Sequence, residues 1–337
     1  EKYAETEEEA DRWYTDQANN RRPPELLPRD EVARAINSEV KAGRGTPHGG
    51  VYLDVSTRLP ADVIKRRLPS MWHQFKELAD VDITEQPMEV GPTCHYVMGG
   101  VQVDPDTGAA TGVPGLFAAG EVAGGMHGSN RLGGNSLSDL LVFGRIAGVG
   151  ASQYVNGLSG RPSVTDSEID RALAHANKPF NSNGSENPYA LHEELQQMMN
   201  DLVGIIRDEN EVADAIKNLE NLKARAKNIK VEGDRRFNTG WHLALDLDNM
   251  LYVSEAVAKS ALTRQESRGG HTRNDYPTMD PNWRKWNILS TANGDTVSVE
   301  KEANPLLPKE LAELFEVDEL KKYLLPEELE ALGMGGK

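Results

Sequence analysis

Several features are scarce in this 337-residue sequence, and each scarcity narrows what the protein can be. It has a single cysteine, Cys94, which excludes an internal disulfide and a multi-cysteine metal site and fits a reducing cytoplasm. No run of about 18 apolar residues occurs, so we expect no segment to span a membrane. The 37 basic residues are outnumbered by 53 acidic ones, giving a net charge of −16, which argues against a nucleic-acid backbone as the main partner.

What the sequence does contain predicts a multi-domain globular protein. Its length exceeds the roughly 250–300 residues at which single hydrophobic cores stop growing, and 38% of its residues are apolar. We therefore expect two or three domains. The acidic balance does not exclude an anionic substrate, because such a substrate needs only a few arginines inside its pocket.

The first 87 residues predict a mixed α and β region. Asp30 is expected to cap a helix that ends at Gly43, where a glycine can adopt the left-handed conformation of a helix end. Residues 51–55 predict a short strand, and residues 61–79 predict an amphipathic helix that is interrupted near Pro69.

The centre of the chain predicts strand, turn and strand over 96–103, 104–108 and 115–119, followed by a glycine-dotted apolar helix over 136–154. Glycines inside a helix cost roughly 1 kcal/mol each relative to alanine, so we expect them to serve close packing against a sheet or a cofactor.

Three long amphipathic stretches follow, over 191–206, 212–227 and 241–261, and they predict a three-helix bundle. Near the end of the chain, residues 308–323 are rich in Glu and Leu and predict a further helix.

The most informative stretch is 91–145, where paired glycines lie among His95, Glu121 and Arg131. The pairs Gly99-Gly100, Gly124-Gly125 and Gly133-Gly134 let the backbone reach positive φ or approach a ligand closely. Such a stretch is typical of a cofactor pocket.

Four motifs make the chain resemble the flavoprotein subunit of succinate dehydrogenase and fumarate reductase. In the family's order they are PTCHYVMGG, PGLFAAGE, HGSNRLGGNSL and ESRGGHTRNDYP, and the resemblance runs from about residue 28 to about residue 290. It implies that the protein oxidises succinate to fumarate in the tricarboxylic acid cycle, with the hydride passing to FAD and the electrons passing to an iron–sulfur subunit, then to quinone.

The resemblance implies an α/β and α+β multi-domain fold. Its parts would be the remainder of a capping domain (1–87), the C-terminal part of an FAD-binding α/β domain (88–155), a helical bundle (156–262) and a C-terminal segment (263–337). Membrane anchor subunits would complete the complex, with this chain a peripheral subunit on the cytoplasmic face of the inner (plasma) membrane.

One expected motif is missing from these residues. No predicted strand is followed by GxGxxG, the turn that seats a dinucleotide pyrophosphate at a helix N-terminus. In the resembled family this motif lies upstream, and the sequence does not begin with Met. We therefore expect the C-terminal part of a longer subunit, with an incomplete cofactor site.

Succinate carries two carboxylates, and its oxidation removes a hydride and a proton, so the site needs cations and a proton acceptor. Arginine binds carboxylate bidentately and keeps its charge. The resemblance implies that His95 and Arg131 hold the dicarboxylate and that Arg29 is the catalytic proton acceptor in oxidation and donor in reduction. Because arginine has a pKa of about 12.5 or more, it implies a relay of acids and arginines whose acid lies upstream.

Each assignment has a plainer alternative. Arg29 could be an ion-pair partner or helix-start residue beside Asp30, and His95 could be a hydrogen-bonded core residue. Arg131 stands among glycines and asparagines rather than apolar neighbours, which favours a cavity. His127, in the same motif, could line the site as well.

The flavin contacts follow from the same resemblance. Glu121 resembles the acid that accepts hydrogen bonds from hydroxyls of FAD, although it could be an ordinary turn residue. Asn135, Ser136 and Leu137 begin the apolar helix, whose free N–H groups would stabilise negative charge on the reduced ring. The alternative is a plain Asn or Ser N-cap. We expect no metal site in this chain.

Other functions remain open at this point. L-aspartate oxidase is a related flavoprotein, but its counterpart of NRLGGNSL is similar to NRMASNSL, which favours the dicarboxylate dehydrogenase. Fumarate reductase is the reverse of the same chemistry, and a non-enzyme alternative is an inert fragment or a helical binding module. The charges of ESRGGHTRNDYP are expected to tie the bundle to the flavin domain or to face the iron–sulfur partner.

Overall fold

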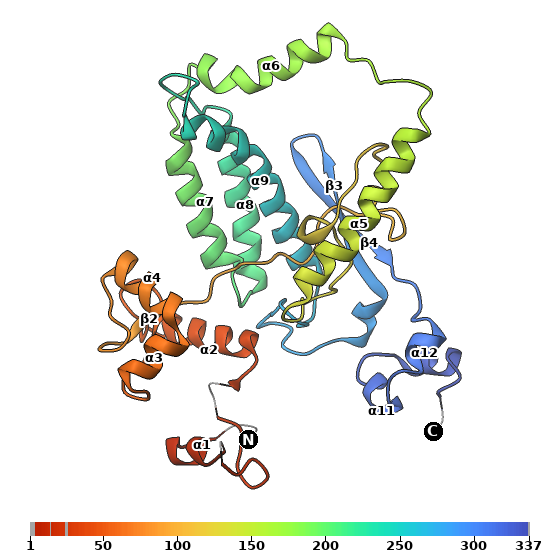
Figure 1. Cartoon of the computed structure of the whole chain (residues 1–337). Coiled ribbons are helices and arrows are strands. Elements are labelled where there is room, and N and C mark those ends of the chain that lie inside the picture. Colours follow the sequence, from red (N-terminus) through yellow and green to blue (C-terminus); the bar gives the residue numbers. More distant parts are fainter. Residues whose placement is uncertain (1–3, 14, 24–25, 336–337) are drawn as a thin grey trace. The chain divides into compact units, whose positions relative to one another are not determined.

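The computed structural model describes residues 4–13, 15–23 and 26–335. The chain divides into two compact units, one up to Val97 and one from Met98. Figure 1 colours the chain from its red N-terminal to its blue C-terminal elements. The finer division into four domains, which the sequence suggests, stays a prediction.

The first unit is a small α+β structure. Its two strands pair antiparallel, with Val51 opposite Val90, and its core is formed by Ile64, Ile83 and Met88. The elements are α1 (Glu7–Trp13), α2 (Arg29–Lys41), β1 (Val51–Leu53), α3 (Ala61–Arg67), α4 (Pro69–Ala79) and β2 (Met88–Val90).

Two details of this unit test the sequence predictions directly. The helix expected over 61–79 is indeed divided, because Pro69 begins α4 and lacks the N–H that would continue α3. Asp30, however, is not the N-cap of α2. Pro28 occupies that position with extended backbone, and the carboxylate of Asp30 instead forms an ion pair with Arg34, one turn later, at 3.0 Å.

The second unit holds the remaining elements. Its strands form an antiparallel hairpin in which Trp286 lies opposite Ala303. The elements are η2 (Gly120–Val122), α5 (Asn135–Asn156), α6 (Asp166–Asn181), α7 (Pro188–Leu202), α8 (Glu209–Ala226), α9 (Thr239–Thr263), η3 (Pro281–Lys285), β3 (Trp286–Asn293), β4 (Thr296–Ala303), α10 (Lys309–Ala312), α11 (Val317–Leu320) and α12 (Pro326–Ala331).

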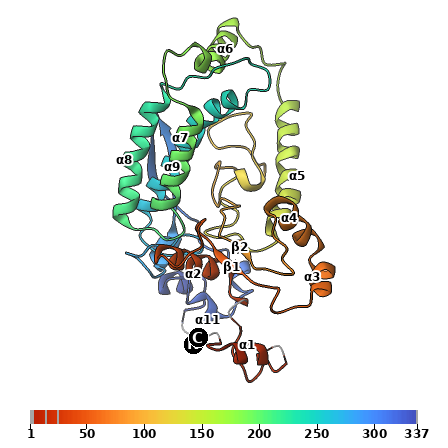
Figure 2. The same cartoon turned by 90° about the vertical axis from the view of Figure 1, so that its left-hand side faces the viewer.

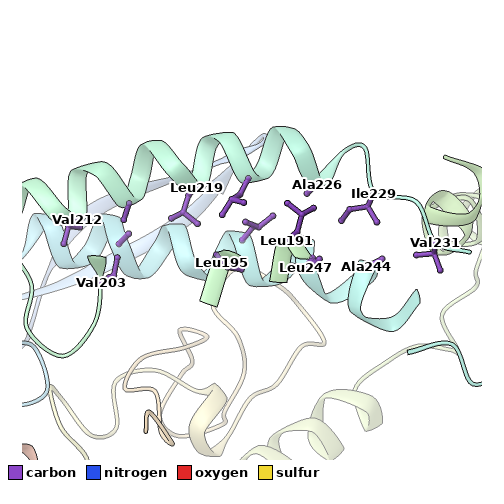
Figure 3. Packing of buried hydrophobic residues seen from close by; sticks show 14 residues of the cluster. Leu191, Leu195, Val203, Val212, Leu219, Ala226, Ile229, Val231, Ala244 and Leu247 are labelled. Carbon is purple, nitrogen blue, oxygen red and sulfur yellow. The ribbon is translucent and has the colours of Figure 1, made fainter. Parts of the chain in front are cut away.

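The predicted three-helix bundle is present as α7, α8 and α9, which lie side by side in Figures 1 and 2. Each helix begins after a side chain that accepts a backbone N–H, and these caps are Asn187, Asp208 and Asn238. Apolar side chains at helical spacing meet between the helices, as Figure 3 shows. The fully buried ones include Val212, Ala215, Leu219, Leu247 and Ala258.

The strand, turn and strand expected over 96–119 is only partly correct. The turn forms, because the carboxylate of Asp104 accepts the backbone N–H of Thr107 at 2.9 Å. Within this described stretch the flanking residues make single bridges rather than ladders, such as Val101 with Ala123. Gly99, with φ at +120°, interrupts the extended backbone two residues before Val101. A regular strand therefore cannot run through 96–103.

The apolar helix expected over 136–154 is confirmed as α5, and one of its glycines packs closely against another segment of the described chain. A Cβ on Gly150 would lie 2.2 Å from the carbonyl oxygen of Thr107, whereas Gly144 and Gly148 have nothing within 4 Å of that position. Gly150 therefore allows the Asp104 turn to approach α5 closely.

The single helix expected over 308–323 is wrong. Two one-turn helices, α10 and α11, form instead. A straight helix over this range would be about 24 Å long and could not fold back so that Ala312, Leu320 and Leu329 share one cluster, as they do.

Candidate active site

Arg29 and His95, two of the three residues expected to act on substrate, belong to the first unit. Arg29 is the first residue of α2 and is exposed. The nearby carboxylate of Asp30 is paired with Arg34, so the plain ion pair between Arg29 and Asp30 is not the arrangement that the structure shows. An exposed guanidinium at a helix start is available to a ligand.

His95 lies in an exposed segment before the end of the first unit. Its Nδ1 lies 3.3 Å from the carbonyl oxygen of Thr93, a contact that favours the tautomer with the proton on Nδ1. An exposed ring is not the environment of a core histidine, and the contact orients the ring from within its own segment.

Arg131 belongs to the second unit and is half-buried in a glycine-rich loop, residues 124–134. One of its guanidinium nitrogens donates to the carbonyl oxygen of Leu132 at 3.0 Å. Gly125, Gly128 and Gly134 in this loop all have positive φ, a conformation that side-chain-bearing residues rarely adopt. The loop is therefore built to follow a path that only glycines allow.

A pair that the sequence analysis missed fixes this loop to α5. Nε2 of His127 lies 3.1 Å from a carboxylate oxygen of Asp139, and the two side chains are 13% and 2% exposed. A carboxylate buried this deeply is kept only where a partner compensates its lost hydration. The signal in the sequence was an acid inside an otherwise apolar helix, and His127 serves as its partner.

Helix α5 begins directly after the same loop. Gly134, with φ at +84°, is the N-cap, and no side chain of the described residues caps the helix. The alternative of an Asn or Ser N-cap is therefore wrong, since Asn135, Ser136 and Leu137 form the first turn. The helix start is left with backbone N–H groups and a positive dipole end, which suit an electron-rich ligand.

Glu121 lies in the short 3₁₀ helix η2, which packs against α5, and it is exposed. The packing is close, because a Cβ on Gly120 would approach a methyl of Leu140 to 2.8 Å. A carboxylate is thereby held on the surface beside the apolar helix.

These residues fit a flavin. The surface of the second unit offers a carboxylate for hydroxyls, a helix start without a side-chain cap, and exposed apolar side chains for a flat ring, among them Leu132 and Leu137 at 71% and 68% exposed. Gly133 and Gly134 have nothing within 4 Å of an added Cβ, so the backbone there is open to a ligand.

Two further properties concern metals and membranes. Among the described residues, no group of three or more His, Cys, Asp or Glu side chains could hold a metal ion. In the same residues, no helix is both long and apolar enough to cross a membrane.

Comparison with known proteins defines the class. A family model described as FAD binding domain matches residues 10–137, and one described as fumarate reductase flavoprotein C-term matches residues 192–318. The class is therefore that of the FAD-binding flavoproteins, and FAD is the cofactor that this class binds. More particularly, the chain belongs to the succinate dehydrogenase and fumarate reductase flavoprotein family.

Individual relatives agree with the family. Sdh1 of Mycobacterium smegmatis, solved in complex with UQ1, is 61% identical with a TM-score of 0.82, and the match covers 91% of this chain and 52% of that one. The succinate dehydrogenase flavoprotein subunit of Coxiella burnetii is 38% identical, covering 77% and 46%. The 8-methylmenaquinol:fumarate reductase flavoprotein subunit of Wolinella succinogenes is 37% identical, covering 76% and 43%.

The chain therefore spans about half the length of the relatives that it matches. The multi-domain α/β and α+β fold expected from the sequence is confirmed by the solved structure of Sdh1.

Proposed function

We propose that the chain is the C-terminal part of a succinate dehydrogenase flavoprotein subunit, which oxidises succinate to fumarate. The 61% identity to Sdh1 of Mycobacterium smegmatis supports this reaction. The string NRLGGNSL, residues 130–137, supports it over the related L-aspartate oxidase.

The observation that carries the proposal is the setting of Arg131. It is the cation of a glycine-rich loop that leads directly into the start of α5, and that loop is fixed to α5 through His127 and Asp139. A guanidinium held by a fixed loop can bind a carboxylate bidentately, close to the helix start where the flavin would lie.

The residues of this chain then have distinct roles. Arg131 binds one carboxylate of succinate, and His95 helps to hold the dicarboxylate. Arg29 takes the proton from a methylene carbon of succinate after the relay has accepted a proton from its guanidinium, and the positive charge that Arg29 regains favours the carbanion-like transition state. FAD, when bound, supplies the acceptor for the hydride.

Glu121 and the first turn of α5 are proposed to hold the flavin. Glu121 accepts hydrogen bonds from hydroxyls of FAD, and the N–H groups at Asn135, Ser136 and Leu137 stabilise negative charge near the ring. Electrons leave to an iron–sulfur subunit, then through membrane anchor subunits to quinone. The relatives named as flavoprotein subunits support such an assembly, in which this chain would be peripheral.

The test is Arg29→Lys in the complete FAD-containing subunit. Lysine keeps the charge but lacks the planar fork and the relay geometry. We expect FAD content to stay normal while succinate oxidation and fumarate reduction both fall by about a hundredfold or more.

Arg34→Lys is the matched control, because Arg34 is on the same helix and holds the neighbouring carboxylate of Asp30 at 3.0 Å. We expect that variant to keep its activity. If Arg29→Lys turned over at the rate of Arg34→Lys, the catalytic role of Arg29 would be wrong.

A further inference from the structure

The motif ESRGGHTRNDYP forms a tight two-residue turn that the proposed chemistry does not use. Arg268 and His271 exchange both backbone hydrogen bonds, at 2.8 and 3.0 Å, so Gly269 and Gly270 form the tip of the turn. Gly269 has φ at +60°, which glycine adopts without strain. We refer to residues 268–271 as the double-glycine turn.

The tip of the turn lies against the loop that carries Arg131. The backbone N–H of Gly270 donates to the carbonyl oxygen of Ser129 at 2.9 Å. A Cβ on Gly269 would lie 2.6 Å from both the carbonyl oxygen and the hydroxyl of Ser129. No side chain fits between the two backbones, and Ser129 is two residues before Arg131.

One side of the turn is anchored by a buried carboxylate. Glu266 is fully buried and accepts two hydrogen bonds from Arg268, at 2.8 and 3.0 Å. Arg264 and the backbone N–H of Asp280 bind the same carboxylate. Arg268 also donates to the carbonyl oxygen of Asp280, so the side chain at the start of the turn is held on both sides of its guanidinium.

The other side is anchored to the bundle through His271. Its Nδ1 accepts a hydrogen bond from Arg207 at 2.9 Å, and its Nε2 donates to the carbonyl oxygen of Arg264 at 3.1 Å. Arg207 in turn donates to carbonyl oxygens just after α7, those of Val203 and Gly204. The turn is therefore built on the ends of two bundle helices.

The loop that the turn contacts needs such an external support. Three of its glycines have positive φ, and a Cβ on Gly125 or Gly128 would meet nothing within 4 Å. Glycine-rich backbone loses more conformational freedom on ordering than any other kind. The loop is also held by His127 with Asp139 and by the backbone of Gly124 with Val101, and the contact at Ser129 connects it to the double-glycine turn.

We propose that Gly269 and Gly270 are positioning residues of the dicarboxylate site, because the double-glycine turn grips Ser129 and so fixes the loop that presents Arg131. This inference rests on the proposed function of Arg131. It assigns the motif a specific role, which is to connect the helical bundle to the loop of Arg131 and so keep the substrate-binding guanidinium in place.

Gly269→Asn in the complete FAD-containing subunit is the test, and Gly294→Asn is its matched control. Gly294 has φ at +61° in the hairpin between β3 and β4, with nothing within 4 Å of an added Cβ. Asparagine tolerates positive φ, so both variants should fold, and of the two only Gly269→Asn would place a Cβ against Ser129. Hydrogen–deuterium exchange of the peptides covering 124–134 and the dissociation constant of malonate are measured in both.

We expect faster exchange over 124–134 and a malonate dissociation constant raised on the order of tenfold or more in Gly269→Asn, with neither change in Gly294→Asn. Both variants should keep their FAD content. Exchange over 124–134 that matches the Gly294→Asn control would overturn the inference. Faster exchange with unchanged malonate binding would overturn it as well, whereas unchanged malonate binding in Arg131→Ala would instead refute the role of Arg131 in the proposed function.

Discussion

Two helices of the second unit show how differently apolar side chains can be used. Helix α8, with 18 residues, buries Val212, Ala215, Leu219, Leu222 and Ala226 along one stripe. Helix α5, with 22 residues, is the more apolar in sequence, yet it buries only Asp139, Ala147 and Gly150. Its large apolar side chains are mostly exposed, and they include Leu137, Leu140, Leu141, Val142, Val149 and Val155.

The bundle of α7, α8 and α9 buries its apolar side chains within the described chain, whereas α5 leaves most of its own exposed. An apolar stripe on α8 is satisfied by α7 and α9, which are in the same unit. A helix that is apolar on most sides is suited to burial on most sides, and a large exposed apolar patch is typical of an interaction site. Changes in the bundle should therefore alter stability, whereas changes around α5 should alter what the protein binds.

The largest expected effect concerns the cofactor. We expect the 337-residue chain, expressed by itself, to lose FAD during purification, because these residues contain no GxGxxG to seat the pyrophosphate. Glu121 and the start of α5 supply only a few of the contacts. Flavin absorbance measures this directly. A yellow protein with one flavin per chain would show that α5 and its surroundings bind the cofactor without further residues.

A pair of leucines tests the comparison of the two helices itself. Leu219 in α8 is 1% exposed and Leu141 in α5 is 77% exposed. In this chain, Leu219→Ala should lower the free energy of unfolding by about 2–5 kcal/mol, whereas Leu141→Ala should change it by about 0.5 kcal/mol or less. Urea denaturation of both variants is the measurement, and equal losses would contradict the distinction between the two helices.

The bundle was predictable because its information is local. Periodic apolar residues and the capping residues Asn187, Asp208 and Asn238 are adjacent in sequence to the helices they define. The same kind of signal was available for α6, which was not predicted although Thr165 and Glu168 form a capping box. By contrast, the division of 308–323 into α10 and α11 depends on a cluster with distant leucines, which periodicity does not show.

The candidate site was predictable in its residue types but not in its supports. Arg131 and Glu121 stand in motifs that indicate their chemistry from sequence. The partner of His127, which is Asp139, and the grip of Gly270 on Ser129 depend on how separate segments fold against each other. For Gly270 the two partners are more than a hundred residues apart, so no spacing rule could pair them.

Removing the guanidinium of Arg131, which is proposed to bind the substrate, should have an intermediate effect that is confined to the binding of dicarboxylates. Arg131→Ala deletes charge-assisted hydrogen bonds worth about 1.5–3 kcal/mol, so in the complete subunit malonate should bind about ten- to a hundredfold more weakly. Arg171→Ala, an exposed arginine of α6, is the control and should bind malonate normally. An unchanged malonate dissociation constant in Arg131→Ala would make this arginine a structural residue.

The smallest expected effect is a pH dependence of the free energy of unfolding, which arises from His271 at the ends of the bundle helices. Burial of His271, together with the charges of Arg207, Arg264 and Arg273, lowers its pKa from 6.5 to about 4, although its hydrogen bond to the carbonyl oxygen of Arg264 acts in the opposite direction. The unfolded chain therefore binds a proton at a higher pH than the folded chain does. The stability that neutral His271 provides is complete above pH 6.5 and is lost as the pH falls from 6.5 towards 4.

His271→Gln keeps a donor and an acceptor but does not titrate. Between about pH 7.5 and pH 5, the free energy of unfolding should consequently fall less in His271→Gln than in the wild-type chain. His175→Gln, at an exposed position of α6, should follow the wild type, so that the carboxylates which also titrate in this range cancel in the comparison. If the free energy of unfolding fell equally with pH in the wild-type chain and in His271→Gln, His271 would not be the group responsible for this pH dependence.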